Sequence, residues 1–238
     1  MNTPDECQVL SLWQTIVTVQ QQNLGDDFNT RLNAIAIKAE RNVSPSGSFY
    51  DRTGYYNLFD LDDPDIRVFA NLMSHRFRAH LYLQYKDAYA YHWDVSVRAF
   101  ANVYDYGQRI RPHYHHACDF VSVYYTELGD GSKPDFKTNE AGRLVVIDPR
   151  GAVQYPFSTK CQRVPTEKGC LVIHPAYLEH ESETHFAKGL RVMVACEFTI
   201  LHGQRRAFGP LPQVDNPNPP PILPTEFSGD TIYHAHYK

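Results

Sequence analysis

Apolar residues recur at helical spacing in two stretches of the N-terminal part of the chain. Residues 27–41 carry an imperfect apolar stripe among charged positions, behind an aspartate that would cap a helix. Over residues 66–85 apolar side chains return at steps of three and four, and Pro64 stands where a helix would begin. The sequence therefore predicts two helices here, joined by a loop or irregular strand over 42–63 that packs on the domain.

The hydrophobic period changes from helical to two-residue spacing after Trp93. Short segments rich in β-branched and aromatic residues alternate with turns that contain Gly, Pro, Asp and Ser. These segments cover residues 95–104, 120–125, 144–147, 170–173 and 190–198. Several short strands at such spacing favour a sandwich or a barrel. The predicted fold class is mainly β with N-terminal helices.

The C-terminal end of the chain differs in composition, because seven of the 16 prolines fall between Pro210 and Pro224. Such a run forms neither a helix nor a central strand, so it predicts an extended, polyproline-like arm. We divide the chain into an N-terminal helical and loop region packed on the barrel (1–92), a β core (93–207) and the Pro-rich arm (208–238). Two interpretations of the arm stay open: it wraps the domain or a neighbouring subunit, which would give a homodimer, or it is a partly disordered tail.

Composition and charge exclude several classes of function. The 238 residues are 42% hydrophobic and 21% charged, which is typical of a folded globular protein. The net charge of −4 argues against a nucleic-acid partner, because binding through phosphates needs a basic face. No apolar run approaches the roughly 20 residues that cross a bilayer, and the N-terminus lacks the pattern of a signal peptide. Five scattered cysteines without a CxxC motif fit a reducing compartment, so we expect a cytoplasmic protein without nucleic-acid or membrane partners.

Histidines cluster at two places in the predicted β region. In an extended segment residues two apart point to the same side, so His113 and His115 present both imidazoles to one point. The second cluster follows the apolar strand 170–173, which ends at a proline turn and delivers His180. Arg191 follows His180 by 11 positions. Two ligands from one segment and a third from a distant strand form the facial arrangement of mononuclear non-haem iron enzymes, which leaves the opposite face open.

The ligand set predicted here departs from the common two-His, one-carboxylate pattern. His115 occupies the position that a carboxylate would fill in an HxD or HxE motif, and Asp119 lies four residues further on. A structural alternative stays open for each residue. A single histidine in a strand is often an ordinary polar residue, and His115 could support the site from behind while water, Asp119 or His116 completes it.

Several motifs in the β region match one family when they are taken together. They are Arg111-Pro112-His113-Tyr114-His115, Ser122-Val123-Tyr124-Tyr125, Asp148-Pro149-Arg150, the segment from Gly169 to His180, and Arg191. Over about residues 93–200 the chain resembles a family of 2-oxoglutarate/Fe(II) oxygenases. That family has a Pro-His-x-His stretch, a Ser-Gly-Val-Tyr-Tyr strand, an Asp-Pro-Arg turn and a Gly-x-Leu-Val-x-Phe-Pro-x-x-x-x-His segment followed by Arg. This chain departs from the pattern at His174, which replaces the family's Phe, at Phe100, which replaces its Trp, and at Ser122, which precedes Val123 without the Gly.

The resemblance implies a double-stranded β-helix, a cupin-like jelly roll, with iron at its mouth. It implies that Fe(II) is held by His113, His180 and His115, and that 2-oxoglutarate is the co-substrate. Arg191 would then hold the far carboxylate of 2-oxoglutarate as a fork, and Tyr125 would add a hydrogen bond. The implied reaction is that of a dioxygenase, which uses O₂ to hydroxylate a small-molecule or amino-acid-like substrate and releases succinate and CO₂.

Residues that contact the substrate are harder to select from the sequence. Arg52, Arg98 and Asn102 are our candidates, because they could pair with a charged or polar substrate near the mouth of the barrel. Two other functions remain open. One is a three-His, cupin-type dioxygenase similar to thiol dioxygenases, which needs no 2-oxoglutarate. The other is a non-enzymatic jelly-roll module that binds a metal such as zinc. The position of Arg191 favours the 2-oxoglutarate-dependent dioxygenase over both.

Overall fold

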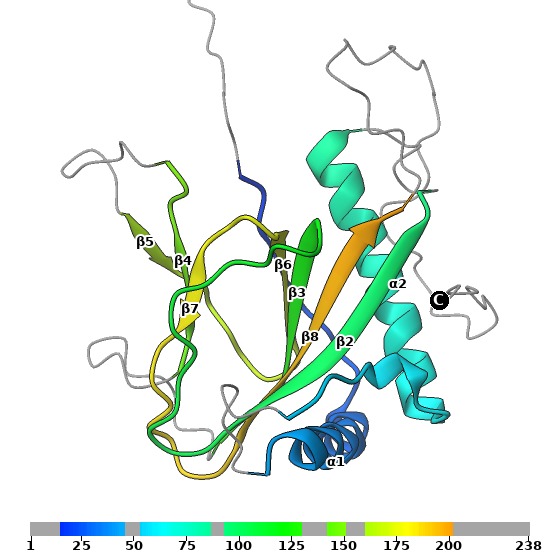
Figure 1. Cartoon of the computed structure of the whole chain (residues 1–238), viewed down its shortest axis with the longest axis vertical. Helices are drawn as coiled ribbons and strands as arrows, with labels where there is room; N and C mark the ends of the chain where they lie inside the picture. The colour runs from blue at the N-terminus through cyan, green and yellow to red at the C-terminus, as the bar shows by residue number, and fades with distance from the viewer. Residues whose placement is uncertain (1–14, 46–52, 87–92, 130–141, 151–159, 202–238) are drawn as a thin grey trace, which may run out of the picture.

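Two antiparallel sheets form the centre of the computed structural model, which describes residues 15–45, 53–86, 93–129, 142–150 and 160–201. The larger sheet has the strand order β1-β6-β3-β8-β2 and the smaller one β5-β4-β7 (Figure 1). In chain order the strands are β1 (Thr18–Gln21), β2 (Val95–Tyr104), β3 (Phe120–Leu128), β4 (Leu144–Ile147), β5 (Cys161–Arg163), β6 (Cys170–Pro175), β7 (His180–Ser182) and β8 (Arg191–Ile200). Neighbours in the order are mostly distant in the sequence, so segments far apart along the chain meet in the larger sheet.

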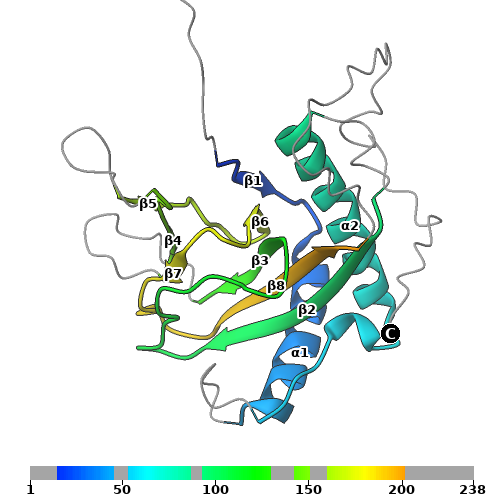
Figure 2. The same ribbon diagram turned by 45° about the horizontal axis from the view of Figure 1, so that its top comes forward.

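Both helices, α1 (Asp26–Val43) and α2 (Pro64–Tyr85), lie on one side of the larger sheet, and the smaller sheet lies on the other (Figure 2). The predicted apolar stripes are the buried faces of these helices. Leu32 and Phe69 are fully buried against the sheet, and Phe77 stacks on Phe198 of β8 at a centroid distance of 4.0 Å. The helices therefore close one face of the sheet and leave the other free to build a site.

β3 separates two apolar cores. Phe120 and Tyr124 belong to the core under the helices, whereas Val121, Val123 and Tyr125 belong to the core between the sheets. Because successive side chains point to opposite faces of a strand, the near-continuous apolar run of β3 is explained by burial on both sides.

The two helices begin differently. At α2 the Asp63 carboxylate caps the helix by accepting hydrogen bonds from the backbone N–H groups of Asp65 and Ile66, and Pro64 follows as predicted. At α1 the expected cap by an aspartate is wrong. The capping position is Gly25, with φ 81°, and no side chain caps the helix. Asp27 lies within the first turn, where its charge still favours the helix dipole.

The segment before α2 covers the exposed edge of β2. The Asn57 side-chain oxygen accepts from the Ala99 N–H at 2.8 Å, and the Tyr56 hydroxyl accepts from the Ala101 N–H at 2.8 Å. A short 3-10 turn, η2 (Leu58–Asp60), follows. These contacts satisfy backbone groups that an edge strand would otherwise leave open to pairing with another chain. The expectation that this segment packs on the domain is confirmed for its described part.

The predicted mainly β fold with N-terminal helices is confirmed, and the two antiparallel sheets are consistent with a jelly roll. β1, β5 and β7 were not predicted. The division into three regions stays a prediction, and the Pro-rich arm over 208–238, with the homodimer through it, lies outside the described residues. In the described part of the chain, no helix is long and apolar enough to span a membrane. The cytoplasmic location likewise stays a prediction.

Candidate metal centre and its pockets

The backbone brings the two histidine clusters together. His113 lies in the loop between β2 and β3, and His180 is the first residue of β7. Their backbones exchange two hydrogen bonds, each 2.9 Å long. Two residues on, the His115 N–H donates to the carbonyl oxygen of Ala176 at 3.0 Å. The loop is thus fixed by main-chain bonds on either side of Tyr114, and its alternation turns both imidazoles to the same side, as the His-x-His spacing predicts.

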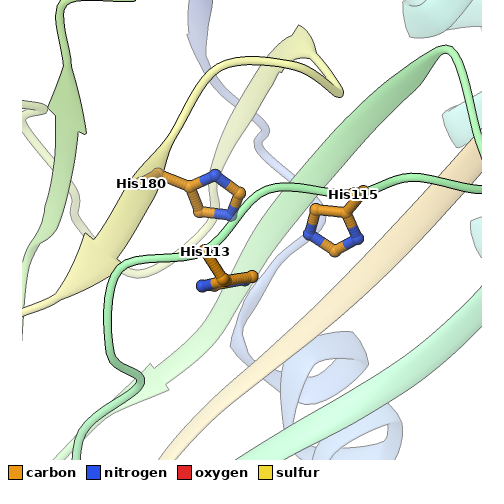
Figure 3. A group of neighbouring side chains, drawn as sticks. All are labelled: His113, His115 and His180. Carbon is orange, nitrogen blue, oxygen red and sulfur yellow. The ribbon is translucent and has the colours of Figure 1, made fainter.

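The three imidazoles surround one common space (Figure 3). The ring centroid of His113 lies 4.3 Å from that of His180 and 5.2 Å from that of His115. One ring nitrogen from each residue lies within 4.8 Å of the other two. This geometry allows a single metal ion to bind all three side chains, which would leave its other face open.

Hydrogen bonds select the nitrogen that each ring offers. Nδ1 of His113 lies 2.9 Å from the carbonyl oxygen of Arg111, and Nδ1 of His180 lies 2.8 Å from that of Leu178. Since a carbonyl oxygen only accepts, both Nδ1 atoms carry the proton and donate. Nε2 is left with a free lone pair in each ring. This arrangement, with the outer ring N–H held by an acceptor, is the one found in metal-binding histidines.

His115 is anchored by a carboxylate instead of a carbonyl group. Its Nδ1 lies 2.8 Å from Oε1 of Glu197 on β8, so here too Nε2 is free to bind a metal. Burial alone would raise the pKa of Glu197, but the hydrogen bond from His115 and the charge of Arg98 outweigh it, and the pKa is lowered. Glu197 therefore stays ionised beside the ring.

The lowered pKa values of two of these histidines favour the neutral form that binds a metal. Burial, reinforced by the neighbouring imidazoles, lowers the pKa of His180 to about 2. Burial also lowers the pKa of His113. Metal ions bind the neutral imidazole, so at neutral pH these two rings need not lose a proton first. Imidazole ligands suit iron, zinc, copper and nickel alike, and the three residues fit an Fe(II) ion.

The other histidines near the site have different surroundings. His174 on β6 packs edge-on against the ring of His180, at a centroid distance of 4.6 Å, and its Nδ1 bonds to the Pro175 carbonyl oxygen. His116 lies beside Tyr114, 4.4 Å between ring centroids, and His185 contacts the carbonyl oxygen of Gly189. His115 also belongs to a second group of possible ligand atoms, with Cys118 and Glu197.

An inner pocket extends from the three imidazoles between the two sheets. It has an empty volume of about 500 Å³ with its open mouth included, and its walls are mostly apolar. Arg191, only 1% exposed, lies in its lining together with Tyr125 and Asn102. The guanidinium carbon of Arg191 lies 5.2 Å from the centre of the Tyr125 ring. A buried cation in an apolar pocket beside a metal-binding group is suited to bind a small dianion that also reaches the metal.

Both pocket residues keep their ordinary protonation at neutral pH. Burial raises the pKa of Tyr125 to about 12, so its phenol remains a hydrogen-bond donor. Burial lowers the pKa of Arg191, but a guanidinium in a protein keeps its charge. The pocket therefore offers one positive charge and one hydroxyl donor within apolar walls.

An outer hollow opens on two of these imidazoles, those of His113 and His115, from the solvent side. It encloses about 1930 Å³, including open solvent, and shares His113 and His115 with the inner pocket. Arg98 and Arg111 line it with several tyrosines. Arg98 lies in this hollow and pairs with Glu197, whereas Asn102 lines the inner pocket instead. Arg52 is outside the described residues.

Sequence reasoning missed Glu197, which contacts a candidate ligand directly. A signal for it existed in the sequence of β8. Glu197 is an acidic residue in an otherwise apolar strand, and it follows Arg191 at an even spacing, so both point to the same face. A charged side chain at such a position needs a partner, and the first histidine cluster supplies one.

Antiparallel sheets with a His-x-His segment, a distant histidine and a buried arginine in one pocket fit one class of protein, the mononuclear non-haem iron oxygenases. Residues 98–197 match the profile of the family described as "Putative 2OG-Fe(II) oxygenase". This part of the chain is therefore similar to a family whose enzymes depend on Fe(II) and 2-oxoglutarate. The predictions of the family, of an oxidoreductase and of these two cofactors are thereby confirmed.

Comparisons of the fold find several solved structures that are similar to this chain. A prolyl-4-hydroxylase from Pseudomonas putida is 15% identical, with a TM-score of 0.51 over 78% of this chain and 88% of that one. HygX from Streptomyces hygroscopicus, solved with nickel and 2-oxoglutarate, is 11% identical, with a TM-score of 0.51 over 78% and 82% of the two chains. A prolyl hydroxylase from Trichoplax adhaerens, in complex with a peptide fragment of hypoxia inducible factor, is 12% identical, with a TM-score of 0.50 over 77% and 83%. At these identities the likeness concerns the fold alone, and the sequences of curated proteins give no match.

Proposed function

We propose that this protein is an Fe(II)/2-oxoglutarate-dependent dioxygenase that hydroxylates a small-molecule or amino-acid-like substrate on a double-stranded β-helix. One observation carries the proposal. Three imidazoles, each with its outer nitrogen anchored, line an apolar inner pocket that holds a buried arginine, and those of His113 and His115 also line the outer hollow. The pocket suits the co-substrate and the hollow suits the substrate, so the two would reach the metal from different sides.

Each candidate residue has one role in this proposal. His113, His115 and His180 hold Fe(II) through Nε2. Arg191 binds the far carboxylate of 2-oxoglutarate, and Tyr125 donates a hydrogen bond beside it. When bound, the iron couples the oxidative decarboxylation of 2-oxoglutarate, to succinate and CO₂, to the insertion of oxygen into a substrate C–H bond.

The remaining residues of the site position the reactants and exclude water. The apolar walls around Arg191 strengthen its attraction for a carboxylate, because an apolar surrounding screens charge less than water does. We propose that Asn102 contributes a polar contact inside this pocket. Arg98 and Arg52 are proposed to contact the substrate, Arg98 from the lining of the outer hollow.

The experiment that tests this function adds Fe(II) and 2-oxoglutarate to the protein without oxygen. A weak visible charge-transfer band should develop, and on admission of O₂ succinate should form as O₂ is consumed. His113→Ala and His180→Ala should abolish the band and the succinate. His116→Ala, which changes a neighbouring exposed histidine, should leave the metal content unchanged.

The same experiment separates the competing functions. Metal binding without the band would contradict the use of 2-oxoglutarate and favour a three-His dioxygenase of the thiol dioxygenase type. Metal binding without any O₂ consumption, over a panel of thiols and small amino acids, would favour the non-enzymatic module. Retained metal in both alanine variants would contradict the proposed ligands.

A further inference from the structure

We propose that Glu197 is a positioning residue that acts through His115 and supplies the metal centre with the negative charge that its own ligands lack. The inference rests on the proposed metal site. Three neutral imidazoles bring no charge to a 2+ ion, whereas the common facial triad brings one carboxylate. In this chain the carboxylate of Glu197 is separated from the proposed metal position by the imidazole ring of His115.

Glu197 differs from the anchors of the other two ligands. His113 and His180 donate to neutral backbone carbonyl groups, whereas His115 donates to a carboxylate at 2.8 Å. The side chains of His115 and Glu197 are only 14% and 13% exposed, so little water screens the pair. A carboxylate that accepts the outer N–H of an imidazole makes the other ring nitrogen a stronger donor to the metal.

The orientation of Glu197 is fixed from its other side. Arg98 donates to Oε2 through Nη2 at 2.7 Å and through Nε at 3.0 Å, which leaves Oε1 directed at His115. Arg98 and Glu197 are direct partners in the register of β2 and β8. The sheet itself therefore sets the position of the carboxylate, and the chain Arg98–Glu197–His115 ends at the metal site.

A different use of the same atoms has to be considered. Nitrogen, sulfur and oxygen atoms of His115, Cys118 and Glu197 also lie within 4.8 Å of one another, as for a second metal ion. Burial and the nearby carboxylates raise the pKa of Cys118 to about 12, so its sulfur is a protonated thiol at neutral pH. A metal there would have to remove protons from both Cys118 and Nδ1 of His115, which favours the hydrogen-bonded arrangement.

The test compares the binding of Co(II), as a spectroscopic probe, to the full chain and to Glu197→Gln. The glutamine keeps the shape and the acceptor oxygen but removes the charge. Co(II) affinity should fall about 10- to 100-fold, as for other residues behind metal ligands. The Fe(II)–2-oxoglutarate charge-transfer band should move to higher energy, because an iron with less electron-rich ligands is harder to oxidise. A role confined to folding would not move that band.

Two control variants separate charge from structure. Asp65→Asn removes a carboxylate that pairs with Arg31 at 2.6 Å, far along the chain from the site, and should leave Co(II) affinity unchanged. Arg98→Met removes the residue that orients Glu197 but leaves the charge of the carboxylate beside His115, so it should weaken Co(II) binding clearly less than Glu197→Gln does. A loss in Arg98→Met equal to that in Glu197→Gln would overturn the proposal, since the pair would then act through the sheet.

A double variant gives the sharpest comparison. When His115→Asp places a carboxylate directly on the metal, the added change Glu197→Gln should no longer lower Co(II) affinity. A second tenfold loss there, unchanged affinity in the single Glu197→Gln variant, or binding of two ions per chain with one lost in Cys118→Ala would each overturn the inference. Succinate formation is measured separately, so Co(II) binding that responds to Glu197→Gln without succinate contradicts only the proposed function. A parent chain that binds no Co(II) would overturn both.

Discussion

Gly142 lies directly against the guanidinium of Arg191, so close that a side chain on Gly142 would collide with Nη1. The same glycine has a left-handed backbone with φ 60°, and it lies just before β4. The absence of a side chain at this position thus leaves room for the cation in the inner pocket. If Arg191 binds 2-oxoglutarate as proposed, this contact makes the binding depend on Gly142 as well.

We expect Gly142→Ala to weaken the binding of 2-oxoglutarate at least about tenfold, the effect of roughly 1.4 kcal/mol, because the methyl group displaces Arg191. Metal binding should be retained. Calorimetric titration of the metal-loaded protein with 2-oxoglutarate measures the effect. Gly107→Ala is the matched control, since Gly107 has a similar backbone with φ 84° but nothing within 4 Å of the added carbon. An equal loss in both variants would mean that backbone strain alone is responsible.

Substitution of Arg191 itself should separate the co-substrate from the metal. Arg191→Met keeps a long apolar side chain in the buried position but removes the charge that would pair with a carboxylate. Loss of one member of a buried charge pair costs about 2–5 kcal/mol, so the 2-oxoglutarate requirement should rise by more than tenfold. Iron content should change little. Equal affinity for 2-oxoglutarate in the variant and the parent chain would discredit the anchor role.

Buried histidines should make the protein less stable in mild acid. Burial lowers the pKa of His174 to about 4, against an ordinary value of 6.5. The unfolded chain therefore takes up a proton first, so this residue costs no stability above pH 6.5 and progressively more as the pH falls toward 4. The loss between pH 7.5 and 5 is about 2 kcal/mol for this group.

His174→Phe replaces the imidazole with a ring of similar shape that does not titrate. Phe is the residue that the 2-oxoglutarate/Fe(II) oxygenase family carries at this position. Denaturant unfolding of the metal-free protein at both pH values should show a smaller loss of stability in the variant, by about 2 kcal/mol. An unchanged difference between the two pH values would show that His174 does not contribute. His80 shares the same shift, to a pKa of about 4, and should account for part of the remaining loss.

The cover over the edge of β2 can be tested with two adjacent tyrosines. Tyr56 donates its hydroxyl to the buried Glu40 at 2.9 Å and accepts from the Ala101 N–H. Tyr56→Phe should lower the free energy of unfolding by about 1–3 kcal/mol, because buried polar groups lose a partner. Tyr55, which is 90% exposed, is the control, and Tyr55→Phe should have no measurable effect in the same denaturant titration. Equal stability of both variants would contradict the role of Tyr56.

The elements with a strong period were predictable from the sequence, and the short ones were not. The apolar stripe of α2, its start at Pro64 and the five longer β segments follow from local rules of spacing and turns. β7 contains only three residues, and its pairing with β4 is set by tertiary contacts. The start of α1 was misplaced because Gly25, which has no capping side chain, takes the position where an aspartate was expected.

For the site, the spacing of His113 and His115 was informative because strand geometry converts it directly into a shared direction. The structure brings His180 and Arg191 to the same pocket, as the sequence motifs suggested. Glu197 stands out in the sequence as an acidic residue in a mostly apolar strand, but its partner on a distant loop could not be derived from that signal. Gly142 gave no signal, because its contact with the Arg191 guanidinium is made across the fold.

Because β3 is buried on both faces, this single strand separates the pocket from the core under the helices. Val123 and Tyr125 face the pocket side, while Phe120 and Tyr124 face the helices. Inserting or deleting a single residue early in this strand would exchange the two sets. Aromatic rings meant for the helices would then fill the pocket, and the pocket's lining would be turned toward the helices. In evolution and in engineering, β3 should therefore tolerate exchanges of one apolar side chain for another far better than any change in its length.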